Sequence, residues 1–177
     1  AACPTALTKV EVVLLLDVTS SMELAAKLQH ATAAAHVFLD AMDLDLSRVG
    51  LVTFNHVAAV RSPLVGRQDE ASLRAALDSL SPSGQTNISG AIDLAFTLLR
   101  DSAIGNQQAM VVLTDGYNTV PGADPVPVAA ARAKAAAVTI ATFCAGGACD
   151  PGLEPAASGP QFYFSVPDTS KLPELYR

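Results

Sequence analysis

The sequence has no cluster of basic residues. It holds 11 Lys and Arg against 17 Asp and Glu, for a formal net charge of −6, and no two basic residues are adjacent. Nucleic acids and anionic membrane surfaces attract clustered Lys and Arg. The charge balance therefore argues against both as partners.

A membrane-spanning hydrophobic run is also missing. The strongest apolar stretch, residues 10–16, is far shorter than the roughly 20 residues that cross a bilayer as a helix. Half of the chain (50%) is hydrophobic and only 16% is charged, and a chain of this length buries roughly 70% of its unfolded surface. We therefore expect a full core that needs no metal or disulfide to fold, so that a bound metal would serve function.

Zinc-type spacings of cysteine and histidine are absent as well. The three cysteines, Cys3, Cys144 and Cys149, are an odd number, so at least one is free or pairs outside this chain. Cys144 and Cys149 bracket a flexible Ala-Gly-Gly-Ala segment that suits a small disulfide loop. A disulfide would indicate an oxidising compartment, and the sequence alone leaves the bonded and the reduced pair open.

Short apolar runs alternate with longer segments rich in Ala and Leu. The runs predict strands at residues 10–16, 48–54, 57–64, 109–113, 138–143 and 161–165. The segments between them predict helices at about 22–42, 71–80, 88–99, 126–137 and from 171 to the chain end. Ser20 and Glu23 predict a capping box at the first helix. Pro125 and Pro127 suit the first turn of the fourth.

This alternation predicts an α/β fold, a doubly wound and mostly parallel six-stranded sheet with helices on both faces. We expect the strand order 3-2-1-4-5-6, with strand 3 antiparallel because only Asn55 and His56 link it to strand 2. No repeat, linker or low-complexity tract divides the chain, which predicts a single domain over residues 1–177. The chain end cuts the last helix short, so we expect the native polypeptide to continue.

Polar residues follow the two strands at the centre of this sheet. Ligands of open α/β sheets bind beyond the carboxyl ends of the strands, where the strand order reverses. That point lies between the first strand, followed by Asp17, and the fourth, followed by Asp115. Thr19 and Ser21 add hydroxyls at alternate positions. Carboxylates and hydroxyls form a hard oxygen set that suits Mg²⁺, Mn²⁺ or Ca²⁺.

The turn after the first strand argues against a nucleotide site. A dinucleotide-binding turn has the pattern GxGxxG, whose glycines let the backbone approach phosphate. Here the turn has no glycine and carries a carboxylate that would repel phosphate, and GxxxxGK[ST] does not occur. Taken singly, these motifs could also be purely structural. Asp115-Gly116 is a common turn sequence, and Thr86-Asn87 suits the cap of the helix that follows.

Three ordered motifs resemble the von Willebrand factor type A domain family and its metal-ion-dependent adhesion site. Residues 13–22 resemble the strand and the Asp-x-Ser-x-Ser loop, residues 84–92 the segment with a distant Thr, and residues 111–116 the segment with a distant Asp. Residues 162–164 and 172–176 resemble the final strand and helix. Thr19 replaces the first serine of the pattern and keeps its hydroxyl. The resemblance implies one divalent cation, Mg²⁺ foremost, bound directly or through water by Asp17, Thr19, Ser21, Thr86 and Asp115.

The resemblance further implies metal-dependent protein–protein binding, in adhesion or as a scaffold, at the cell surface or outside the cell. A free position on the ion would take a Glu or Asp carboxylate of a protein partner. We expect the domain to belong to a larger polypeptide or assembly, without inserting into a membrane itself. Neighbouring loops would set specificity, with candidate contacts at Asn55, His56, Tyr117 and Asn118.

The position of Cys144 adds to this picture. Cys144 ends the fifth strand on the expected metal face, whereas Cys3 precedes the first strand at the opposite end. This placement favours a pair between Cys144 and Cys149 over any pair with Cys3.

Two other functions compete with adhesion. Related domains are metal-dependent interaction subunits of intracellular ATPase-driven assemblies such as metal chelatases, which reduced cysteines would fit. A Mg²⁺-dependent phosphohydrolase would carry Asp-x-Asp after the first strand, and here Thr19 occupies the second Asp position. A serine hydrolase at Ser89 lacks the upstream glycine of the nucleophile motif. We therefore expect a binding domain and not an enzyme.

Overall fold

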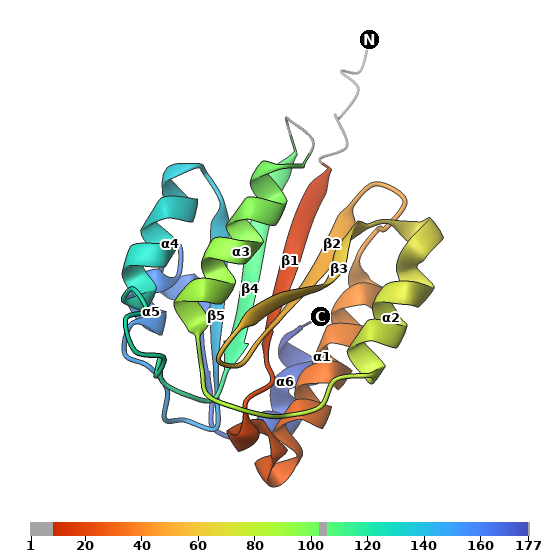
Figure 1. Cartoon of the computed structure of the whole chain (residues 1–177). Coiled ribbons are helices and arrows are strands. Elements are labelled where there is room, and N and C mark those ends of the chain that lie inside the picture. Colours follow the sequence, from red (N-terminus) through yellow and green to blue (C-terminus); the bar gives the residue numbers. More distant parts are fainter. Residues whose placement is uncertain (1–8, 103–105, 177) are drawn as a thin grey trace.

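The computed structural model describes residues 9–102 and 106–176. Within them, one six-stranded sheet has the order β3-β2-β1-β4-β5-β6 (Figure 1). The strands are β1 (Val10–Asp17), β2 (Arg48–Phe54), β3 (Ala58–Val65), β4 (Gln107–Thr114), β5 (Thr139–Ala145) and β6 (Tyr163–Val166). β3 is antiparallel to β2, and the other neighbours are parallel. The predicted fold class and strand order are confirmed.

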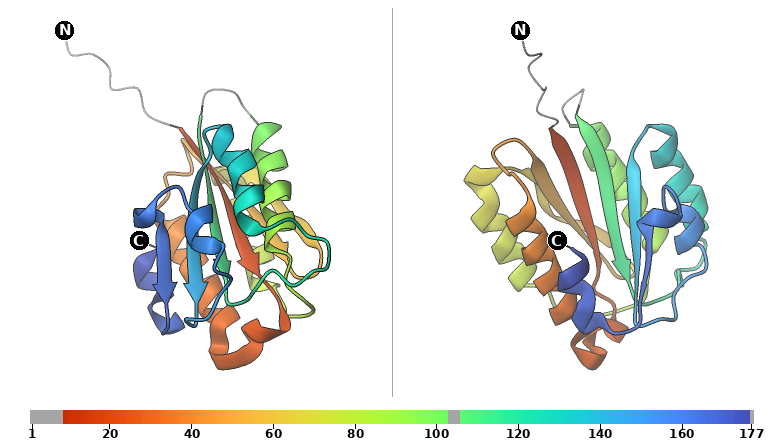
Figure 2. Two further views of the ribbon diagram at one scale, coloured as in Figure 1. Left: turned by 90° about the vertical axis from the view of Figure 1, so that its left-hand side faces the viewer. Right: turned by 180° about the vertical axis from the view of Figure 1, so that it is seen from behind.

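Helices cover both faces of the sheet (Figure 2). One face packs against α1 (Lys27–Ala41), α2 (Glu70–Asp78) and α6 (Leu172–Leu175). The other packs against α3 (Ile88–Arg100), α4 (Val126–Ala135) and α5 (Leu153–Ala156). The 3-10 segments are η1 (Ser20–Ala26), η2 (Arg67–Asp69), η3 (Pro160–Phe162) and η4 (Thr169–Lys171). None of the helices in the described ranges combines the length and the apolarity that crossing a membrane requires.

The central strand β1 is buried on both faces. Leu14 and Leu16 point into the core beneath α1 and α2, whereas Val13 and Leu15 point into the core beneath α3 and α4. A strand covered on both sides has apolar residues at successive positions, which explains the run in the sequence. Each such side chain contributes roughly 1.5–3 kcal/mol by burial. This packing fixes the carboxyl end of β1 in the middle of one edge of the molecule.

The start of the first helix differs from the prediction. α1 begins at Lys27 and not near Met22, and the preceding 3-10 segment has Ala25 and Ala26 at φ 52° and 56°. The predicted capping box is wrong: neither Thr19, before the 3-10 segment, nor Ala26, before α1, caps with its side chain. The backbone N–H of Ser20, which Glu23 would have bound, donates to the carbonyl of Gly84. A long-range contact therefore replaces the local motif.

The other boundaries follow the prediction within a few residues. Pro125 precedes α4 and Pro127 lies in its first turn, as predicted. The sequence patterns did not reveal η2, η3 and the short α5. α6 ends at Leu175, and the prediction of a helix through Arg177 extends outside the described residues.

One buried acid interrupts the apolar run of β1. Glu11 is fully buried and accepts hydrogen bonds from Arg48, Ser102, Asn106 and Gln108. Burial alone raises the pKa of this carboxyl, but the four donors outweigh burial and lower its pKa below the ordinary value. Glu11 thus has its counter-charge and its donors within the fold.

Candidate metal site

Asp17 and Asp115 lie at the carboxyl edge of the sheet. Asp17 is the last residue of β1, and Asp115 follows β4, which pairs with β1 in parallel. β1 is also the strand from which the order runs outward in both directions. The structure therefore brings the two aspartates to the switch point of the sheet, where ligands of such folds bind.

The carboxylate of Asp17 is buried and held by two short hydrogen bonds. Oδ1 accepts from the backbone N–H of Thr19 at 2.7 Å, and Oδ2 accepts from the hydroxyl of Thr114 at 2.5 Å. Burial raises the pKa of Asp17, the hydrogen bonds from Thr114 and Thr19 offset part of this rise, and the charge of Asp115 adds to it. The ionised form of Asp17 is therefore costly unless further positive charge compensates it.

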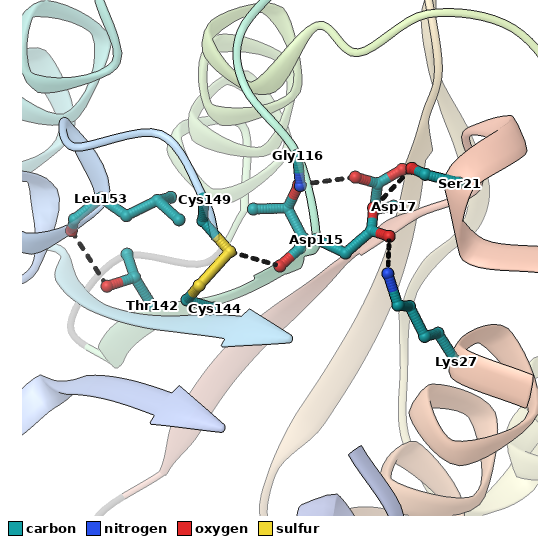
Figure 3. Close-up of a disulfide and its surroundings, with 10 residues drawn as sticks. Asp17, Ser21, Lys27, Asp115, Gly116, Thr142, Cys144, Cys149 and Leu153 are labelled. Carbon is teal, nitrogen blue, oxygen red and sulfur yellow. Dashed lines mark hydrogen bonds and ion pairs between the residues drawn. A yellow bond between two sulfur atoms is a disulfide. The ribbon is translucent and has the colours of Figure 1, made fainter. Parts of the chain in front are cut away.

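Asp115 is linked to the turn that follows Asp17. Its Oδ1 accepts from the hydroxyl of Ser21 at 2.6 Å, and that hydroxyl lies 3.0 Å from the hydroxyl of Thr19. Its Oδ2 accepts from Nζ of Lys27 at 2.5 Å (Figure 3). The side chain of Asp115 is fully buried and that of Lys27 is 19% exposed. Four of the five predicted ligands therefore belong to one hydrogen-bonded group.

Thr86 approaches this group from the loop before α3. A Cβ atom placed on Gly116 would lie only 3.2 Å from Oγ1 of Thr86, so this hydroxyl lies against the residue that follows Asp115. Hydrogen bonds with Thr119 hold the backbone of Thr86. The loop is also tied to the end of β1, where Ser83 donates to the carbonyl of Val18 at 2.7 Å.

The assembled groups are chemically suited to a hard cation. Two buried carboxylates and three hydroxyls offer oxygen ligands alone, which Mg²⁺, Mn²⁺ and Ca²⁺ accept and soft metals do not prefer. No group of three or more His, Cys, Asp or Glu occurs within residues 9–102 and 106–176 that could hold a metal in another way. A cation at this site would therefore depend on hydroxyl ligands.

A disulfide lies beside the site (Figure 3). Cys144 in β5 pairs with Cys149, with 5.7 Å between their Cα atoms, and the sulfur of Cys149 lies 3.5 Å from the carbonyl oxygen of Thr114. The next residue, Asp150, accepts from the backbone N–H of Asn118 at 2.9 Å and donates its own N–H to the carbonyl of Gly116. The disulfide loop therefore supports the turn that carries Asp115. Cys3 lies outside the described residues.

The four predicted partner contacts differ in how available they are. Tyr117 is 51% exposed, and His56 is exposed on the β2–β3 hairpin. Asn55 instead bonds Val57 and Ser83. Asn118 bonds the N–H of Ile88, the hydroxyl of Ser89 and the carbonyl of Asp124. The amides of Asn55 and Asn118 thus have structural partners, whereas Tyr117 and His56 face solvent.

Sequence reasoning missed three residues of this region. Thr114 precedes Asp115 directly, and the alternation of β4 gave a signal that its side chain could reach Asp17. Lys27 and Asp150 had no local signal, because their contacts with Asp115 and Asn118 span 88 and 32 positions.

Comparison with known proteins identifies the family. The family model of the von Willebrand factor type A domain matches residues 11–177 of the sequence. The chain therefore belongs to this family. Calcium-activated chloride channel regulator 1 of Equus caballus is 35% identical over 113 residues, covering 62% of this chain and 12% of that protein. The protein of the same name from Macaca mulatta is 34% identical over 115 residues, covering 63% and 12%.

Solved structures share the fold at low sequence identity. Proximal thread matrix protein 1 from the mussel byssus superposes with a TM-score of 0.85 at 20% identity, over 96% of this chain and 44% of that one. Another structure of that protein has a zinc-occupied metal-ion-dependent adhesion site (MIDAS) motif, with a TM-score of 0.79 and the same identity and coverage. The pilus adhesin SpaC from Lactobacillus rhamnosus GG gives 0.84 at 16% identity, over 97% and 30%. The chain thus spans less than half of each of these relatives.

Proposed function

We propose that this domain binds one divalent cation through Asp17, Thr19, Ser21, Thr86 and Asp115, and that the cation binds an acidic residue of a protein partner. Mg²⁺ is the proposed ion, with Mn²⁺ and Ca²⁺ as substitutes of the same ligand preference. The cation would supply an electrophilic position for the partner's carboxylate. The domain over residues 1–177 would act in this way within a larger polypeptide or assembly.

One observation carries this proposal: of the two buried carboxylates, only Asp115 has a cationic partner within the described residues. Lys27 pairs with Asp115, and Asp17 forms no ion pair with any residue of the described part of the chain. An unpaired buried charge is costly, and a bound cation relieves that cost. The hydroxyls of Thr19 and Ser21, which lie beside these carboxylates, complete an oxygen set.

Exposed apolar side chains around the site support a protein partner. Leu24, Val57 and Tyr117 are 66%, 59% and 51% exposed, and each lies in a segment that follows a strand at the carboxyl edge of the sheet. Aromatic and apolar side chains are enriched at the centre of protein interfaces. A partner that offers a carboxylate to the ion would also cover these residues. Tyr117, His56, Asn55 and Asn118 remain the proposed contacts.

The disulfide favours an extracellular or cell-surface location over the intracellular, chelatase-like alternative, because disulfides persist in oxidising compartments. The mussel matrix protein and the pilus adhesin agree with this location as relatives of the same fold. We propose a binding role and not a Mg²⁺-dependent phosphohydrolase, since Thr19 occupies the position of the second aspartate of that reaction type.

Equilibrium titration with Mg²⁺ and Mn²⁺ by calorimetry tests the metal site. We expect one ion per chain in the wild type and none in Asp115→Asn. Asp101→Asn is the matched control, because Asp101 is exposed. It follows the carboxyl end of α3, whereas Thr86 lies before the amino end of this helix. Equal binding by all three proteins would refute the proposal.

Capture of partners tests the second half of the proposal. Proteins retained by the wild type in Mg²⁺ should be released by EDTA and should not bind Asp115→Asn. Steady hydrolysis of a phosphate ester that requires Asp17 would instead favour the enzyme. Partners retained equally with EDTA would show that binding does not use the ion.

A further inference from the structure

Lys27 occupies an unusual position for a lysine. It is the first residue of α1, and the first turn of this helix contains no acidic residue. The amino end of a helix carries a partial positive charge, so a cation there is repelled by the backbone. The partner of Lys27 is instead Asp115, which is 88 positions away in the sequence.

The two residues before Lys27 have backbone dihedral angles that are rare for residues other than glycine. Ala25 and Ala26 are both in the left-handed region, at φ 52° and 56°, which residues with a side chain seldom populate. These two residues lie between the turn of Ser21 and the start of α1. Figure 3 shows that the side chain of Lys27 points to Asp115.

The tail of Lys27 also has its own place in the fold. A Cβ atom on Gly146 would lie 3.3 Å from Cε and 3.4 Å from Nζ of Lys27, so the lysine packs against the glycine backbone. Gly146 has φ +94°, which also favours glycine there. The lysine therefore reaches Asp115 along a defined path and is only 19% exposed.

We infer that Lys27 is an internal cation of this site, which binds Asp115 in the ion-free protein and leaves it when a divalent cation binds. This inference rests on the proposed function. Both oxygens of Asp115 have a donor, Ser21 on Oδ1 and Lys27 on Oδ2. A dication bound to Asp115 would repel the ammonium group, so the two cations exclude each other. The lysine thereby neutralises Asp115 when no ion is bound and weakens the binding of the ion.

Substitution of Lys27 tests this competition. Lys27→Met keeps the unbranched tail as far as Cε and removes the charged Nζ, and Lys9→Met is the matched control. Lys9 is exposed and precedes β1, at the end of the strand opposite Asp17. Because coupling between two binding events commonly changes affinity by about 5–150-fold, we expect Lys27→Met to lower the Kd for Mn²⁺ about tenfold and Lys9→Met to leave it unchanged. In EDTA, Lys27→Met should unfold at a lower temperature than the wild type.

The outcomes separate this inference from the proposed function. Tighter Mn²⁺ binding by Lys27→Met alone supports the competition. Equal Kd values in wild type and Lys27→Met overturn it while leaving the metal site intact. Absence of Mn²⁺ binding by the wild type overturns the metal site itself. Lys27→Gln, which retains a donor for Asp115 without the charge, gives the same comparison if Lys27→Met does not fold.

Discussion

Strand β1 carries a buried carboxylate at each end, and the two differ in how the fold treats them. Glu11, near the amino end, has an arginine and three neutral donors, and its pKa is lowered. Asp17, at the carboxyl end, accepts from Thr19 and Thr114 but forms no ion pair with the residues that the structure describes, and burial raises its pKa. The first carboxylate has its counter-charge and donors within the chain, whereas the second is a ligand of the cation proposed above.

This contrast separates a structural acid from a candidate binding acid. Both side chains are fully buried, so exposure does not distinguish them. Their partners do, because a buried charge is tolerated only where opposite charge and hydrogen bonds compensate its desolvation. Removing the charge of Glu11 should therefore lower the unfolding free energy in EDTA, whereas removing the charge of Asp17 should not.

The largest expected effect is at Glu11. Glu11→Gln removes the buried charge that Arg48 and three donors surround, and because hydrogen bonds to a charged group contribute about 1.5–3 kcal/mol each, we expect a loss of about 3 kcal/mol. Urea unfolding in EDTA and in Mg²⁺ should show the same loss of unfolding free energy. A loss that appears only in Mg²⁺ would contradict the division between the two ends.

Asp17 should respond in the opposite sense. Asp17→Asn keeps an acceptor for the N–H of Thr19 and removes a costly charge, so the unfolding free energy in EDTA should stay equal or rise. At an ion concentration of 100 Kd, the wild type should gain about 2.7 kcal/mol and the variant nothing. Thermal unfolding with and without Mg²⁺ measures both effects, with Asp101→Asn as control. A strong loss of stability in EDTA would show that Asp17 is a structural acid like Glu11.

The disulfide should slow local opening only at the carboxyl end of the strands, beside the candidate metal site. Closing so short a loop contributes about 2 kcal/mol, which the double variant Cys144→Ser with Cys149→Ser should lose. Hydrogen exchange should accelerate at Gly116–Asn118, which Asp150 holds, and stay unchanged around Glu11. Uniform acceleration across the sheet would contradict a local role.

The smallest expected effect is a pH dependence at the amino end. The pKa of Glu11 is lower in the fold than its ordinary value of 4.5. The folded state therefore binds the proton less tightly than the unfolded state, and the stabilisation is complete above pH 4.5 and lost as pH falls through the lowered pKa. The difference in unfolding free energy between wild type and Glu11→Gln should shrink over this range. A difference that stays constant with pH would mean that Glu11 is not ionised in the fold.

The sequence predicted well what depends on periodicity and failed where distant contacts decide. Strand β1 and its neighbours were recognised because two-sided burial leaves a continuous apolar run. The capping box failed because the N–H of Ser20 bonds Gly84, a residue of another loop. Glu11 was overlooked within the apolar run, since its compensating donors come from other elements.

The sequence by itself determined the α/β class, the strand order and the arrival of Asp17 and Asp115 at the same edge, because parallel strands must end on one side of a sheet. Only the tertiary structure decided which charges are compensated. Lys27 reaches Asp115 and Arg48 reaches Glu11 across long stretches of chain, while no cation within residues 9–102 and 106–176 pairs with Asp17. Burial and compensation are properties of neighbours in space, and no local pattern of residues encodes them.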